Sequence, residues 1–173
     1  MSKTAWLVIG LFASIQLPLR AQSEIIDRVL AVVVGEVITQ SDVDGMIVLG
    51  LVPTAGGKDE RSVALDRLIE RALMLNEVRR YVPPEPSEAA IDQRLQTIRQ
   101  RFSSPTAFAQ ALAIFGMDEA RLREFVRDEL RIQAYLDERF ASPDVERRHT
   151  LMADWLAGLR RRADVTRLYS SQR

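Results

Sequence analysis

Residues 24–44 read EIIDRVLAVVVGEVITQSDVD, and we expect the rest of the chain to be arranged around this stretch. Two β-branched runs, residues 29–33 and 37–39, stand on either side of a Val-Gly-Glu segment. β-branched side chains suit a pleated surface, and a glycine between such runs supplies the positive φ of a tight turn. The stretch therefore predicts a β-hairpin. Because Val34 resists positive φ, we expect a type II-like turn with Gly35 in its third position.

A helix is expected to follow the hairpin at once. The hydroxyl of Ser41 can accept a hydrogen bond from a free N–H of the first turn, and the acidic residues after it favour the positive end of a helix. We expect a helix from Asp42 to Leu51, with an apolar side made of Val43, Ile47, Val48 and Leu51. An isolated hairpin is marginally stable in water, so the remaining chain must cover it.

The remaining chain is predicted to be nearly all helix, because its apolar residues recur three and four positions apart. Segments rich in Pro, Gly and Ser divide it into helices at 59–80, 88–102, 106–115, 118–140 and 142–162, with a surface linker at 53–58. Helix 59–80 is apolar over more than half of its circumference, which is typical of a helix packed between neighbours. We expect it to be the central helix of a mostly α fold.

Small polar residues mark the predicted helix starts. Ser87, Asp118 and Ser142 each precede a helical pattern, and Pro143 suits the first turn of the last helix. Residues 163–169 then have a strand-like composition. We expect this final segment to pair with the hairpin and complete a small sheet.

Residues 1–21 have the pattern of a secretory signal peptide. Lys3 precedes an uncharged run from Ala5 to Leu17, and Ala21 offers a small residue for cleavage. That run is shorter than the roughly 20 residues needed to span a bilayer. We expect cleavage after Ala21, export to the periplasm and no membrane anchor in the mature protein. Retention of the leader as an uncleaved anchor is the alternative.

The composition excludes several classes of function. The 24 basic residues balance the 24 acidic ones, and loss of Lys3 and Arg20 with the leader leaves a charge of about −2. A chain of this charge has no bulk attraction for nucleic acid or anionic lipid. The sequence has no cysteine, which excludes disulfides, Cys-based metal sites and a cysteine nucleophile. We treat residues 22–173 as one domain, long enough to bury a core.

The sequence offers little for catalysis. His149 is the one histidine, so a zinc site with two histidines or a paired-histidine centre cannot form, and we expect a surface position for it. The Gly-Gly-Lys run at 56–58 lacks the full spacing of a phosphate-binding loop. Glu129 interrupts the apolar stripe of helix 118–140 and is expected to pair with an arginine. We therefore expect no enzymatic activity and no cofactor or metal.

The stretch behind the leader resembles the N-terminal domain of SurA-type periplasmic chaperones. The residues that carry this resemblance are Asp27, Arg28, Val29, Ala31 to Val33, Gly35, Val37 to Thr39 and Ser41 to Asp44. The segment from Trp155 to Val165 is similar to the closing segment of that family. The resemblance implies a helical core of two halves, 22–141 and 142–173, whose last strand returns to the hairpin. Many members insert parvulin-type prolyl isomerase domains between the halves, whereas here Ala141 to Pro143 join them directly, so no prolyl isomerase activity is expected.

The family resemblance implies an ATP-independent chaperone that binds unfolded polypeptides, above all outer-membrane proteins. Such binding needs adaptable apolar surface, which Met, Leu and Phe supply. The predicted client-binding residues are Met46, Leu49 and Leu51 on the first helix, and Phe108, Phe115 and Met117 around Gly116. The alternative is that all six belong to the core.

Other functions stay open. Residues 106–131, two helices around Gly116, have the outline of a helix-turn-helix DNA-binding motif, although the second helix alternates acidic and basic residues. An envelope assembly or scaffold protein without chaperone activity, or a non-catalytic companion of a prolyl isomerase, has the same sequence features. Suppression of client aggregation distinguishes a chaperone from a scaffold.

Overall fold

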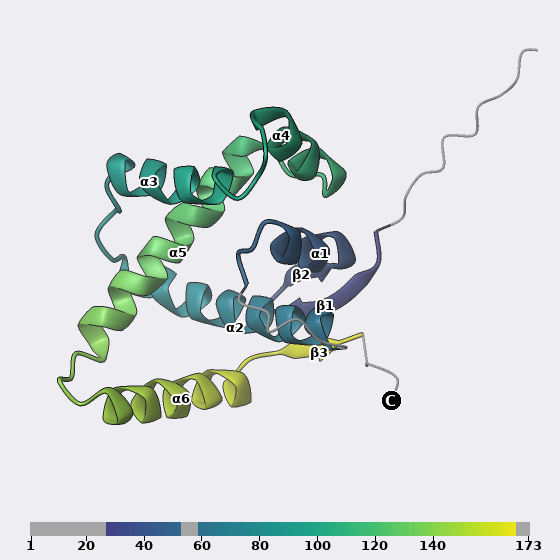
Figure 1. The fold of residues 1–173 in the computed structure, drawn as a ribbon. Coiled ribbons are helices and arrows are strands. Elements are labelled where there is room, and N and C mark those ends of the chain that lie inside the picture. Colours follow the sequence, from purple (N-terminus) through teal and green to yellow (C-terminus); the bar gives the residue numbers. More distant parts are fainter. Residues whose placement is uncertain (1–26, 53–58, 169–173) are drawn as a thin grey trace, which may run out of the picture.

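The computed structural model describes residues 27–52 and 59–168, which form a mostly α-helical fold with a small antiparallel sheet (Figure 1). In chain order the elements are β1 (Val29–Val33), β2 (Glu36–Thr39), α1 (Gln40–Val48), α2 (Glu60–Tyr81), α3 (Glu88–Arg99), α4 (Pro105–Ile114), α5 (Glu119–Arg139), α6 (Val145–Arg162) and β3 (Val165–Arg167). The predicted class of fold is confirmed. The predicted leader and the linker 53–58 lie outside the described residues.

The sheet has the strand order β2-β1-β3, with β1 antiparallel to both neighbours. Ala31 lies opposite Arg167 and Val33 opposite Val165. Two further bonds extend the β1–β3 ladder: the N–H of Val34 donates to the Asp164 carbonyl at 3.0 Å, and that of Leu168 to the Leu30 carbonyl at 2.9 Å. The prediction that the C-terminal segment completes the hairpin is therefore confirmed.

The hairpin turn differs from the expectation. Both central residues have positive φ, 52° at Val34 and 83° at Gly35, which is the type I′ pattern and not type II. A two-residue loop between antiparallel strands favours a turn whose twist matches that of the strands. Pairing on both sides of β1 therefore outweighs the strain at Val34, whose side chain is 44% exposed.

Helix α1 begins two residues earlier than predicted. Its N-cap is Thr39 and not Ser41: the Thr39 hydroxyl accepts from the Asp42 N–H at 3.3 Å, and the Asp42 carboxylate accepts from the Thr39 N–H at 2.8 Å. The N–H of Ser41 donates to Asp27 instead, at 3.1 Å. Because β2 runs straight into the helix, the last strand residue is its cap. Val48, which was predicted to lie on the apolar side of this helix, is 52% exposed.

The other predicted caps are partly confirmed. Ser87 caps α3 and Asp118 caps α5, as expected. At α6 the N-cap is Asp144, whose carboxylate accepts from the Arg147 N–H at 3.1 Å, and the Ser142 hydroxyl accepts from the Asp144 N–H at 3.2 Å. The prediction of Ser142 as the cap is wrong, because the aspartate two residues later takes that role.

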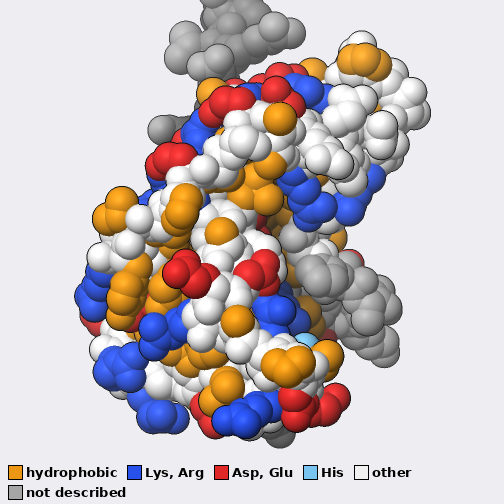
Figure 2. Space-filling model, turned by 90° about the vertical axis from the view of Figure 1, so that its left-hand side faces the viewer, with side chains coloured by type: hydrophobic (Ala, Val, Ile, Leu, Met, Phe, Trp, Pro, Cys, Tyr) orange, Lys and Arg blue, Asp and Glu red, His pale blue; other side chains and the backbone are white. Residues whose placement is uncertain are grey.

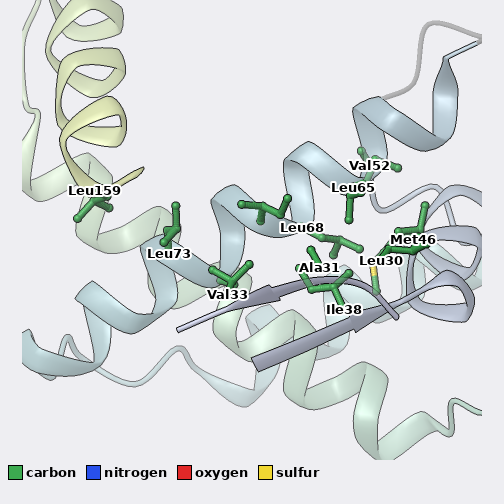
Figure 3. Packing of buried hydrophobic residues seen from close by; sticks show 14 residues of the cluster. Leu30, Ala31, Val33, Ile38, Met46, Val52, Leu65, Leu68, Leu73 and Leu159 are labelled. Carbon is green, nitrogen blue, oxygen red and sulfur yellow. The ribbon is translucent and has the colours of Figure 1, made fainter. Parts of the chain in front are cut away.

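Helix α2 is the centre of the packing, as predicted. Its apolar face covers the sheet, and Figure 3 shows Leu65, Leu68 and Leu73 beside the side chains of the strands. The opposite end of α2 packs with α5 and α6 around Tyr135 and the partly buried Trp155. A further cluster joins α3, α4 and α5. Helix α5 runs diagonally across the molecule, from the α3 and α4 end towards α6 (Figure 1).

Candidate functional site: a groove between β2 and α5

A pocket of about 530 Å³ opens between β2 and the N-terminal half of α5. Its floor is the side of α2 that carries Leu68, Arg71 and Ala72. Strand β2 lines one side and Phe125 of α5 the other. One end is formed by Met46 of α1 and by residues 115–117, the turn between α4 and α5. We call this pocket the β2–α5 groove; its volume lies within the ~300–1,000 Å³ typical of ligand pockets.

The six predicted client-binding residues separate into two groups. Met46, Leu49 and Phe108 are buried, whereas Leu51, Phe115 and Met117 are half-buried. The structure brings Met46, Phe115 and Met117 together in the groove. Leu49 and Phe108 pack in the core formed with α3, α4 and α5. Leu51 packs against that core and also against the core between the sheet and α2. Phe115 and Met117 are therefore accessible in the groove, whereas Met46 lines it as a buried core residue and the other three support the fold.

The position of Phe115 depends on a glycine in α1. A Cβ added at Gly45 would lie 3.2 Å from two side-chain atoms of Phe115, closer than such contacts normally are. The turn itself is held by Arg121, which donates from Nη1 to the carbonyl of Gly116 at 3.0 Å, and Gly116 has φ of 62°. The close approach of α4 to α1 therefore places Phe115 at the end of the groove.

Arg71 is the charged residue of the groove floor. Its side chain is 14% exposed; its Nε donates to Glu129 at 2.7 Å, and its Nη2 donates to the Phe125 carbonyl at 3.4 Å. The guanidinium also lies over the Phe125 ring. The predicted pairing of Glu129 with an arginine is thus confirmed. These contacts fix the floor of the groove against α5.

A buried carboxylate lies behind Arg71. Asp128 is 5% exposed, and its oxygens lie 3.6 Å from Arg71, 3.7 Å from Arg79 and 3.6 Å from Arg131. Burial raises the pKa of the Asp128 carboxyl, and the positive charges of Arg71 and Arg79 oppose that rise. The ion pairs are all longer than a hydrogen bond, so they compensate the desolvation of Asp128 only in part.

Two basic residues of α5 pair with acids of α3. Arg123 pairs with Glu88 and Asp92, each at 2.7 Å, and Arg127 pairs with Glu88 at 3.3 Å. Figure 2 shows red and blue side chains interspersed on one face of the molecule, without a large area of one sign. The side of α5 that faces α3 therefore carries paired charges and not the free basic face with which a recognition helix contacts phosphates.

Other sequence features lie away from the groove. His149 is exposed on α6, which confirms its surface position. Within residues 27–52 and 59–168 there is no cluster of three or more His, Asp or Glu side chains suited to a metal ion. None of the described helices is both long and apolar enough to cross a membrane. A comparison of the sequence with protein-family models and with curated proteins gave no match.

Arg71, Asp128 and the position of β2 beside the groove are not predicted from the sequence. Arg71 stands within the apolar pattern of α2, between Leu68 and Leu75 at helical spacing, and this interruption was a usable signal. Asp128 follows Phe125 by three residues and so lies on the apolar stripe of α5, although the sequence pattern singles out its neighbour Glu129. No signal in the sequence indicated which edge of the sheet borders a groove.

Proposed function

We propose that this protein is a non-enzymatic chaperone of the bacterial cell envelope that holds unfolded polypeptides, outer-membrane proteins above all, in the β2–α5 groove. The observation that carries the proposal is the groove itself, which combines apolar side chains from α1, α5 and the α4–α5 turn with an edge strand of the sheet. An unfolded chain offers both complementary features, exposed apolar side chains and an unpaired backbone.

The residue types of the groove suit clients of varied sequence. The half-buried Met117, Phe115 and Phe125 present flexible or flat apolar surface, which adapts to different side chains with little directional demand. Charges of both signs, Glu36 and Arg121 among them, lie at its rim. A site of this kind favours no single client sequence, as a general holding function requires.

The proposal predicts weak and reversible binding. Release without an energy source requires contacts that break spontaneously, so we expect micromolar affinity, or about 8 kcal/mol. The leader pattern of residues 1–21 supports a location in the envelope, and the resemblance of residues 27–44 to SurA-type chaperones supports this class of client.

Aggregation of a denatured outer-membrane porin, followed by light scattering, tests the proposal. The wild-type protein should slow aggregation at several-fold molar excess. Met117→Lys, which places a charge in the groove, should lose at least half of this effect. Ile114→Lys is the matched control, because Ile114 lies three residues away, is 73% exposed and does not line the groove. If the wild type fails to slow aggregation, the chaperone function is wrong and the scaffold alternative replaces it.

A further inference from the structure

We propose that the client binds as an additional β-strand on the outer edge of β2, with its backbone hydrogen-bonded to Val37. This inference rests on the proposed function and specifies its mode of binding: an extended backbone is recognised first, and apolar side chains second. The position of β2 at the edge of the sheet and beside the groove is the starting point.

The pairing register shows which groups of β2 point outward. In an antiparallel ladder, residues that exchange hydrogen bonds alternate with residues whose N–H and C=O point away. Glu36 lies opposite Val33 across a two-residue turn, and Val37 lies opposite Val32. Val32 is also opposite Thr166 of β3. Val34 and Leu30, two positions away on either side, both bond to β3, so the N–H and C=O of Val32 point towards β3 as well and not towards β2. The N–H and C=O of Val37 therefore point away from β1.

The next outward N–H along the edge is already satisfied. The bond from the Gln40 N–H to the Arg28 carbonyl, at 2.8 Å, places Thr39 in the outward-pointing position of the ladder. The Thr39 N–H donates to the Asp42 carboxylate at 2.8 Å, within the capping box of α1. No side chain of the described residues caps Val37 in this way, and its own side chain is 50% exposed. Val37 is thus the accessible bonding position of the edge.

The groove lies where the side chains of an added strand would go. Ile38 faces α2 and is buried, and side chains directly opposite one another share a face of the sheet. A client residue opposite Ile38 would therefore point to the α2 side of the sheet, where Leu68, Met117 and Phe125 line the groove. The alternate residues would face solvent beside Val37. Backbone groups are common to all clients, so this mode accommodates many sequences.

Proline substitution tests the added strand at a single N–H. Val37→Pro removes the outward N–H without touching a bond of the β1–β2 ladder, and proline is tolerated at an edge position of this kind. Val37→Ala is the matched reference, because it loses the same side chain and keeps the N–H. Arg167→Pro and Arg167→Ala form a second pair on the outer edge of β3, where the N–H of Arg167 points away from β1.

The probe is a fluorescein-labelled, end-capped peptide of alternating Thr and Val, with binding followed by fluorescence anisotropy. Val37→Pro should bind the peptide at least tenfold more weakly than Val37→Ala, whereas the two Arg167 variants should bind alike. The same peptide N-methylated along one edge should bind the wild type at least tenfold more weakly than its parent. Equal binding by the two Val37 variants, or by the two peptides, would overturn the inference.

A measurement on the wild type removes any dependence on how the variants fold. Amide exchange of Val37, followed by NMR, should slow at least tenfold when the peptide is bound; unchanged exchange contradicts strand addition. The aggregation assay separates the two proposals. If Val37→Pro slows porin aggregation as well as Val37→Ala does, strand addition is wrong and the chaperone function stands. If the wild type does not slow aggregation, both fall.

Discussion

The guanidinium of Arg71 lies over the ring of Phe125, with its Cζ 4.0 Å from the ring centroid. This contact joins α2 to α5 under the groove, and the same arginine pairs with Glu129 and Asp128. A single side chain thus links the groove floor to the buried charge of the fold. A change at Arg71 should therefore affect both the stability of the fold and the shape of the groove.

Arg71→Met should destabilise the fold by about 3 kcal/mol, because it leaves Asp128 buried with weaker compensation of its charge. Urea unfolding followed by circular dichroism measures the free energy of unfolding. Arg67→Met is the control: Arg67 is an exposed residue of the same helix, and loss of its pair with Glu70 should cost less than about 1 kcal/mol. Equal losses in the two variants would contradict this role of Arg71.

Asp128→Asn should make the fold more stable than the wild type at pH 7. Burial raises the pKa of Asp128 in the folded state, so the folded protein binds this proton more tightly than the unfolded chain does. Above the folded-state pKa of Asp128 the ionised carboxylate therefore lowers the free energy of unfolding. As the pH falls through that pKa, Asp128 becomes protonated and the free energy of unfolding rises. The advantage of Asp128→Asn should shrink over the same range in urea unfolding. Arg71, Arg79, Arg131, Glu124 and Glu36 surround the carboxyl and contribute to its charge environment.

Asp137 provides a comparison of opposite sign. Hydrogen bonds from Gln133 and Arg148 lower the pKa of the Asp137 carboxyl in the folded state. The ionised carboxylate therefore stabilises the fold at pH values above the pKa of the unfolded chain. This stabilisation is lost as the pH falls through the pKa of the folded state. Asp137→Asn should therefore be less stable than the wild type at pH 7. An Asp128→Asn variant that is also less stable at pH 7 would contradict the account of Asp128.

Val34→Asn should stabilise the protein by about 0.5–1 kcal/mol, because Asn adopts the left-handed conformation with less strain than a β-branched residue. Thermal unfolding should show a higher Tm. Val63→Asn is the matched control: it alters a valine of similar exposure in a helix, where no such strain is relieved. A lower Tm for Val34→Asn would show that packing of Val34 outweighs turn strain.

Removal of residues 163–173 should cost several kcal/mol of a typical total of ~5–15 kcal/mol, because it deletes β3 and exposes the second edge of β1. Truncation after Leu168 keeps β3 and serves as the control. Urea unfolding measures both. A full truncation that unfolds at the same urea concentration as its control would show that β3 contributes little.

Much of the fold followed from local pattern. The hairpin, the central helix and the pairing of the last strand were predicted, because periodicity and turn residues are local signals that the tertiary structure reinforces here. The turn type and the caps of α1 and α6 were predicted wrongly. In each case two local preferences competed. Val34 resists positive φ, but the two-residue loop requires it. Ser41 and Ser142 are suitable N-caps, but Thr39 and Asp144 lie at the positions where the helices begin.

The site was predicted less well than the fold. Residue type identified Phe115 and Met117 as adaptable apolar residues but did not separate them from Met46, Leu49 and Phe108, which have the same character and are buried. Burial depends on the path of α5 over α2, which no short segment encodes. The outward N–H of Val37 likewise depends on the register between distant strands.

The central claim is that unfolded polypeptide occupies the β2–α5 groove, and site-specific photo-crosslinking tests it most directly. A benzophenone amino acid is placed at Phe115 or Met117 in the groove, or at Leu151, an exposed residue of α6 outside it. Each protein is irradiated with denatured outer-membrane porin, and the adducts are quantified by electrophoresis. We predict strong porin adducts at both groove positions and several-fold weaker ones at Leu151. Equal adducts at all three positions, or stronger ones at Leu151, would contradict the claim.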